Sequence, residues 1–234
     1  MRSKWWAKLL HIVGIVLMSL TAAFTLMGGA GTTCVALNPT GFGGKFAGIV
    51  SFQWLWILFV LIGVAAGIMG VLAVVMLVRG TKHSYRAVIA ALVLGSAINA
   101  LHMFASRELR GASMPVDGVL YTNVFTLLVF LLFRFHGIWQ GINFEKSTEE
   151  NQKGSKNAAA IALVAAGLLT LTIQFMMAPT HTIMGSNYAD VWHVALSILG
   201  GGLFLSGVLI SLSTYASAEN FKSLWEVKSL PTRN

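Results

Sequence analysis

The chain has 234 residues, of which 56% are hydrophobic and only 10% are charged. Soluble globular domains carry about 25% charged residues, so this composition excludes an ordinary water-soluble domain. The formal net charge of +8 could suggest nucleic-acid binding. However, the basic residues are dispersed among short loops without an aromatic–basic ribbon, so we expect attraction to anionic lipid headgroups and no nucleic-acid partner.

Apolar runs that are long enough to cross a bilayer recur along the chain. A helix needs about 20 apolar residues to cross a hydrocarbon core of about 30 Å. The sequence predicts an all-α transmembrane bundle in one domain, with about six spans. Their approximate bounds are 9–29, 52–78, 87–105, 119–141, 158–178 and 191–215. The end of the fourth span is an amphipathic extension, because Arg134 and His136 interrupt its apolar run.

The first apolar run must be compared with a signal peptide, because Arg2, Lys4 and Lys8 give it a charged start. Its apolar stretch of about 19 residues exceeds the roughly 7–15 that are typical of a cleaved signal. We therefore expect an uncleaved first span that anchors the chain.

The cations are distributed unequally between the two sets of loops. If the N-terminus is cytoplasmic, only Lys45, Arg107 and Arg110 of the 16 lysines and arginines fall on the outer side. Short basic loops resist translocation, so the distribution predicts that both termini lie in the cytoplasm, in a multi-pass protein of the cell (inner) membrane. The polar stretch 142–157 is then a cytoplasmic connector between a four-span block and a two-span block.

Small residues at helical spacing predict which faces pack together. Helices approach closely in a membrane where small residues recur every three or four positions. Gly63 and Gly67 form such a pair in the second predicted span. His102 continues a face that contains Gly95, and His193 continues one that contains Gly201. The spacing therefore places both histidines toward protein rather than lipid.

Four histidines lie near the ends of four different predicted spans. His102 and His193 are near the outer ends, and His11 and His136 are near the inner ends. A membrane cytochrome with two b-type haems needs this arrangement, because each iron takes one imidazole from each of two facing helices. Haem b is therefore a candidate cofactor. The alternative is that the histidines at the inner interface are amphipathic residues satisfied by water or headgroups.

A second grouping of residues uses the outer face alone. His102, His181, His193 and Asp190 supply the residue types of a zinc or copper site, although no HExxH-like helical pair is present to hold two ligands together. The alternative is a hydrogen-bonded polar cluster that ties the outer loops together. Its members would be Arg107, Glu108, Arg110 and Asp117.

The function classes can be ranked from these features. The sequence contains no phosphate-binding glycine loop, nucleophile elbow or carboxylate pair, so we identify no catalytic residue and expect no enzyme activity from the chain on its own. We expect a membrane subunit of a larger complex, either carrying haem for electron transfer or serving assembly alone. Its partners would be the lipid bilayer and either other membrane proteins or further copies of itself. The alternatives are a passive pathway for a small solute and an outer-face metal site.

Overall fold

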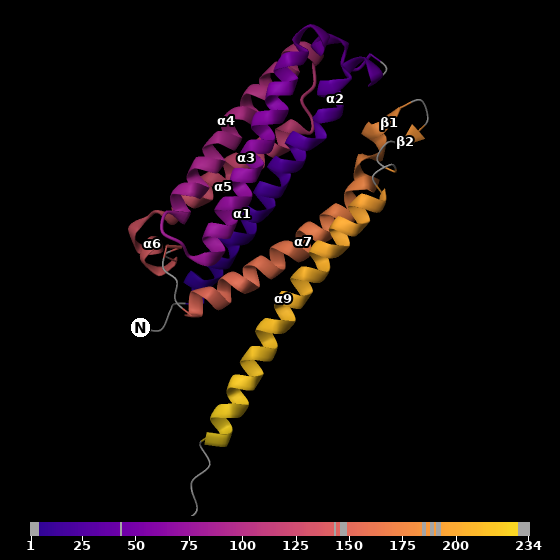
Figure 1. Ribbon diagram of the computed structural model, residues 1–234. Coiled ribbons are helices and arrows are strands. Elements are labelled where there is room, and N and C mark those ends of the chain that lie inside the picture. Colours follow the sequence, from indigo (N-terminus) through magenta and orange to yellow (C-terminus); the bar gives the residue numbers. More distant parts are fainter. Residues whose placement is uncertain are drawn as a thin grey trace, which may run out of the picture.

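The computed structural model describes residues 5–42, 44–142, 144–145, 149–183, 186–187, 190 and 193–228 (Figure 1). Side chains are described for these residues except 149–151, 174, 176–183, 186–187 and 217–228. The elements in chain order are α1 (Trp5–Gly31), α2 (Thr33–Leu37), the 3-10 turns η1 (Pro39–Phe42) and η2 (Ala47–Phe52), α3 (Gln53–Arg79), α4 (Ser84–Arg110), α5 (Val116–Phe133), α6 (His136–Ile142), α7 (Glu149–His181), β1 (Thr182–Ile183), β2 (Ser186–Asn187) and α9 (His193–Lys228).

Within the described residues, six helices are long and apolar enough to cross a membrane. They are α1, α3, α4, α5, α7 and α9. The helical, membrane-spanning architecture expected from the sequence is thus confirmed. The first three predicted spans correspond to three helices of 27 residues each. A helix forms along such an apolar segment because it satisfies every backbone hydrogen bond within the segment itself.

The fourth predicted span differs from the expectation. α5 has 18 residues and ends at Phe133. The amide of Arg134 then donates to the carbonyl of Leu131 in a tightened last turn. α6 follows as a separate short helix, and the guanidinium of Arg134 lies 4.6 Å from the centroid of the Trp139 ring in it. The expected extension to residue 141 is therefore divided in two where the charged residue leaves the apolar run.

The last two spans form a long helical hairpin. α7 has 33 residues and begins at Glu149, so the second half of the expected connector 142–157 is helical. A small antiparallel hairpin, in which Thr182 pairs with Asn187, joins α7 to α9. α7 packs on α1 and α9 packs on α7, whereas α1, α3, α4 and α5 form a compact block. Figure 1 shows α9 diverging from this block along its length.

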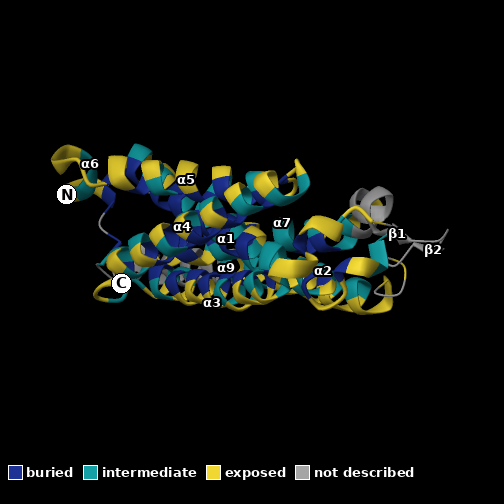
Figure 2. Ribbon diagram, turned by 90° about the horizontal axis from the view of Figure 1, so that it is seen from above, coloured by how far each residue is buried: buried dark blue, intermediate teal, exposed yellow. Residues whose placement is uncertain are grey.

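Helices α1 and α3 cross with their backbones nearly in contact. A Cβ atom added at Gly29 would lie 2.7 Å from the backbone nitrogen of Val64, and one added at Gly67 would lie 2.6 Å from the Cα of Leu26. Gly63 is buried at the same crossing. These contacts confirm the packing face that Gly63 and Gly67 predicted. Figure 2 shows buried residues on the faces that the helices turn toward one another, and exposed residues on the outer faces.

The two ends of the block differ in charge. One end carries the start of α1, the α3–α4 turn, the end of α5 and the start of α7, and we call it the basic end. Its described cations are Lys8, Arg79, Lys82, Arg86, Arg134, Lys153 and Lys156. The opposite end carries Lys45, Arg107 and Arg110.

The α1–α3 crossing gives a direct test of the fold. Substitution Gly67→Val should lower the free energy of unfolding by about 1–3 kcal/mol, because added methyl groups must separate two backbones in contact. Ala65→Val is the matched control, since Ala65 is exposed on the same helix. Unfolding can be followed by tryptophan fluorescence during titration with sodium dodecyl sulfate. Equal stability of the two variants would contradict the close crossing.

Candidate functional site

His102 lies near the end of α4 with its imidazole buried among aromatic rings. The residue is 7% exposed. Its ring stacks on Phe59 with 4.6 Å between centroids, and Trp56 meets it edge-on at 5.7 Å. A cavity of about 20 Å³ lies beside it and is also lined by Asn99 and Gly28. A cavity of this size holds about one water molecule, so we call this place the histidine crevice.

The position of His102 follows from the buried face of α4 that carries small residues. Ala91, Gly95 and Asn99 recur every four residues along this face, and all three are buried. His102 continues the face by one turn, so the prediction that it points toward protein is confirmed. His193, which the spacing also placed toward protein, is instead exposed in the first turn of α9.

A line of buried hydrogen bonds joins α1 to α5 in the middle of the block. The hydroxyls of Thr21 and Thr126 lie 2.7 Å apart. One turn away, the amide nitrogen of Asn123 donates to the hydroxyl of Thr25 at 2.8 Å. We call these four residues the polar seam. Buried polar groups in a membrane are costly unless paired, and the seam pairs them across two helices.

Glycine makes room for the seam on the facing helix α4. A Cβ at Gly95 would collide with the side-chain oxygen of Asn123, so only glycine allows this approach. Sequence reasoning missed the seam threonines Thr21, Thr25 and Thr126. A signal was present, because Thr21 and Thr25 are four residues apart on the buried face of α1.

The seam does not continue to the basic end. Toward that end the block is filled by buried apolar side chains, among them Ile15, Met18, Leu92, Phe130 and Phe133. Phe130 stacks on Phe144 with 5.6 Å between ring centroids. A small solute that entered from the histidine crevice would meet this packed layer.

An ion pair joins the last turn of α4 to the first turn of α5 at the end opposite the basic end. Arg107 donates to the carboxylate of Asp117 and to the hydroxyl of Ser113, in both cases at 2.9 Å. Arg110 donates to the carbonyl of Ala112 at 2.7 Å, and its guanidinium lies 4.8 Å from the centroid of the Phe46 ring. The structure therefore brings three residues of the expected polar cluster to one loop.

The fourth residue of that cluster, Glu108, is exposed on α4. The hydrogen bonds of Arg107 and Arg110 link the end of α4 to the start of α5, and the contact of Arg110 with Phe46 reaches the residue that precedes η2. The contacts of this loop are those of a structural tie between elements at the membrane surface.

The two histidines expected near the inner face have separate environments. His11 is 5% exposed, its Nε2 lies 3.0 Å from the hydroxyl of Ser155 in α7, and its ring stacks on Phe144. His136 is exposed on α6, with its Nε2 2.9 Å from the side-chain nitrogen of Gln140. His11 thus fastens the start of α7 to α1, an interaction that sequence spacing did not reveal.

These environments do not fit a haem. In the described part of the chain, His102 is covered by rings of α3, whereas His193 lies on α9, which packs along α7. Pockets for ligands of drug or cofactor size measure roughly 300–1,000 Å³, far more than the cavity beside His102. The Nε2 atoms of His11 and His136, which could bind iron, are each engaged in a hydrogen bond.

The outer-face metal grouping is not assembled by the described residues. Asp190 and His193 are exposed, whereas His102 is buried within the block. The side chain of His181 lies outside the described residues. Among the residues that are described, no group of three or more histidine, cysteine, aspartate or glutamate side chains lies close enough to hold a metal ion.

The polar seam predicts a measurable coupling between α1 and α5. A double-mutant cycle with Thr25→Ala and Asn123→Ala should give a coupling energy of about 0.6–1.7 kcal/mol, the range found for hydrogen bonds between membrane helices. Thr122→Ala is the control partner for Asn123→Ala, because the Thr122 hydroxyl bonds to carbonyls of its own helix. Coupling of Asn123 to Thr122 but not to Thr25 would contradict the seam.

The packing around the histidines predicts the absorption spectrum. Protein purified in detergent from cells supplied with a haem precursor should show no Soret band in the oxidised or dithionite-reduced state, because the cavity beside His102 is too small for a porphyrin and the His11 ring is packed against Phe144. A Soret band with sharpened reduced α-bands that disappears in His102→Ala would contradict this packing.

No family model, no curated protein and no solved structure matches the chain. Its function must therefore follow from its own residues and their geometry.

Proposed function

We propose that this chain is an accessory subunit of a membrane complex, with its basic end in the cytoplasm, and that α9 is the helix that binds its partner. The proposal assigns it neither catalysis nor solute passage. The observation that carries it is the placement of α9, which packs along α7 and makes comparable contact with no other helix of the described part.

The two faces of α9 differ in how closely a backbone can approach. On the face toward α7, a Cβ at Gly200 would lie 2.8 Å from the Leu171 side chain, and one at Gly207 would lie 2.7 Å from the Ala160 carbonyl oxygen. These glycines are therefore used in packing within the chain.

Glycines also occur where the chain itself does not need them. A Cβ at Gly201 or Gly202 would meet nothing within 4 Å. Glycine weakens a helix relative to alanine, so two glycines with open space bring a cost and no benefit within this chain. In membranes, close helix approach depends on such small residues. A helix of another subunit, packed against Gly201 and Gly202, would account for both glycines.

Large apolar side chains flank the open glycines. Ile198 is 72% exposed, Leu205 60%, Leu209 65% and Leu212 59%. Lipid can cover such side chains, so their exposure alone does not require a partner. Together with the narrow glycine surface they form a ridge and groove of the kind that a second helix can fit.

The other functions expected from the sequence have less support. The apolar layer beneath the polar seam gives no support to a passive pathway, and the small cavity beside His102 gives none to a haem at that residue. A subunit that only assembles needs neither a pathway nor a cofactor.

Crosslinking from single cysteines tests the proposal. Cys34, the single cysteine of the chain, is replaced by serine. Leu205→Cys or Leu209→Cys is then labelled with benzophenone maleimide and irradiated in native membranes. We expect crosslinked species of higher mass from these positions because they border the proposed interface. Leu61→Cys on α3 and Leu128→Cys on α5 are matched controls, since both leucines are similarly exposed. Differently tagged copies distinguish a second copy of this chain from another protein.

A second variant separates interface from lipid contact. Gly202→Val should reduce crosslinking from Leu205→Cys severalfold without lowering the stability of the chain, because the added side chain meets no atom of the protein. Crosslinks that form equally from α3, α5 and α9, and that Gly202→Val leaves unchanged, would reject α9 as the docking helix.

A further inference from the structure

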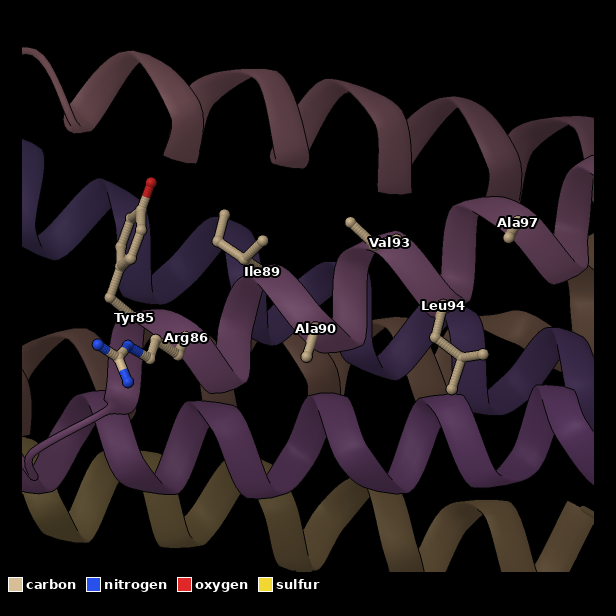
Figure 3. A pocket seen from close by; sticks show the side chains of 7 residues that line it. All are labelled: Tyr85, Arg86, Ile89, Ala90, Val93, Leu94 and Ala97. Atoms are coloured by element: carbon tan, nitrogen blue, oxygen red, sulfur yellow. The ribbon is translucent and has the colours of Figure 1, made fainter.

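A shallow groove of about 550 Å³ runs along the outer face of α4 (Figure 3). All seven side chains that line it come from α4, and its surface is almost entirely apolar. Ala90 and Ala97 are exposed and contribute only methyl groups, whereas Ile89, Val93 and Leu94 form its walls. The groove is therefore hollow where the helix has its smallest residues.

The length of the groove matches one leaflet of a bilayer. Tyr85 and Arg86 line one end, and from Arg86 the groove extends to Ala97. At about 1.5 Å per residue this distance is roughly 16 Å, which is about half of the hydrocarbon core of about 30 Å. Since Arg86 lies in the first turn of α4, the groove begins at the membrane surface and ends near the midplane. One acyl chain of a lipid has this reach.

The surface end of the groove is positively charged. Arg86 is exposed there, and within the described residues it forms no ion pair with a carboxylate. Arg134 adds a second cation, because its guanidinium lies 5.6 Å from the centroid of the Tyr85 ring, which also lines the groove. Guanidinium groups bind phosphate oxygens through paired hydrogen bonds.

We propose that this groove is a binding site for one anionic glycerophospholipid, with an acyl chain along Ala90 and Ala97 and the headgroup phosphate at Arg86. The charge at one end and the apolar hollow at the other match the two halves of such a molecule. The tyrosine hydroxyl at the entrance does not compete, because it donates to the Phe130 carbonyl at 3.0 Å. The site does not depend on the docking of α9.

Native mass spectrometry of the full-length protein tests the site. The protein is exchanged into detergent that contains equal amounts of phosphatidylglycerol and phosphatidylcholine with the same acyl chains. We expect wild-type protein to retain one phosphatidylglycerol preferentially. Arg86→Gln should reduce this preference about tenfold, the effect of losing one charge-assisted hydrogen bond. Arg86→Lys should restore part of it, because it keeps the charge without the paired donors.

Filling the groove gives an independent measurement. Ala90→Leu together with Ala97→Leu should reduce the retention of both lipids, because the added side chains occupy the acyl channel. Both alanines are exposed, so the fold should not change. Arg79→Gln and Ala65→Leu are matched controls, since each replaces an exposed residue of α3 that does not line the groove.

Two outcomes would overturn the site. If Arg79→Gln lowers the preference for phosphatidylglycerol as much as Arg86→Gln does, the lipid is held by diffuse charge. If the double leucine variant retains lipid as wild type does, no acyl chain lies in the groove.

Discussion

The close crossing of α1 and α3 is the contact on which the rest of the block depends. In a bilayer, apolar helices gain little free energy by burying apolar surface against each other, because lipid is equally apolar. The van der Waals contacts that small residues allow between closely approaching backbones supply the attraction. Gly29, Gly67 and Gly70 allow that approach over about two turns. Because α1 also contacts α5 and α7, fixing it against α3 positions Thr25 opposite Asn123 and His11 opposite Ser155.

The membrane-spanning helices and one packing face could be predicted from the sequence, because a single physical rule determines each of them. The need to satisfy every backbone group in lipid makes apolar runs of sufficient length helical, and the glycine spacing in 63–67 identified a packing face. The break at Arg134 was harder to predict. An apolar run interrupted by one arginine could continue as an amphipathic helix, and the aromatic rings of Trp139 and Tyr85 come close to Arg134 only after folding.

The candidate site shows the limit of spacing arguments. Helical periodicity says which face a residue occupies, and it placed His102 correctly. It does not say which helix lies opposite, so His102 and His193 looked like partners although α4 and α9 pack on different neighbours. The threonines of the seam were missed for a related reason: a threonine in a membrane helix can bond its own backbone, as Thr25 does to Thr21, and its second partner exists only after packing.

The shortness of α5 has a consequence for the membrane around the protein. Its 18 residues span about 27 Å, whereas each 27-residue helix beside it spans about 40 Å. Charged residues lie at both ends of α5: the Arg107–Asp117 pair at its start and Arg134 at its end. Bilayer cores range from about 27 Å to about 33 Å, so hydrophobic mismatch is smallest in the thinnest of them. A thicker bilayer would have to thin locally beside α5 to match the length of this one helix.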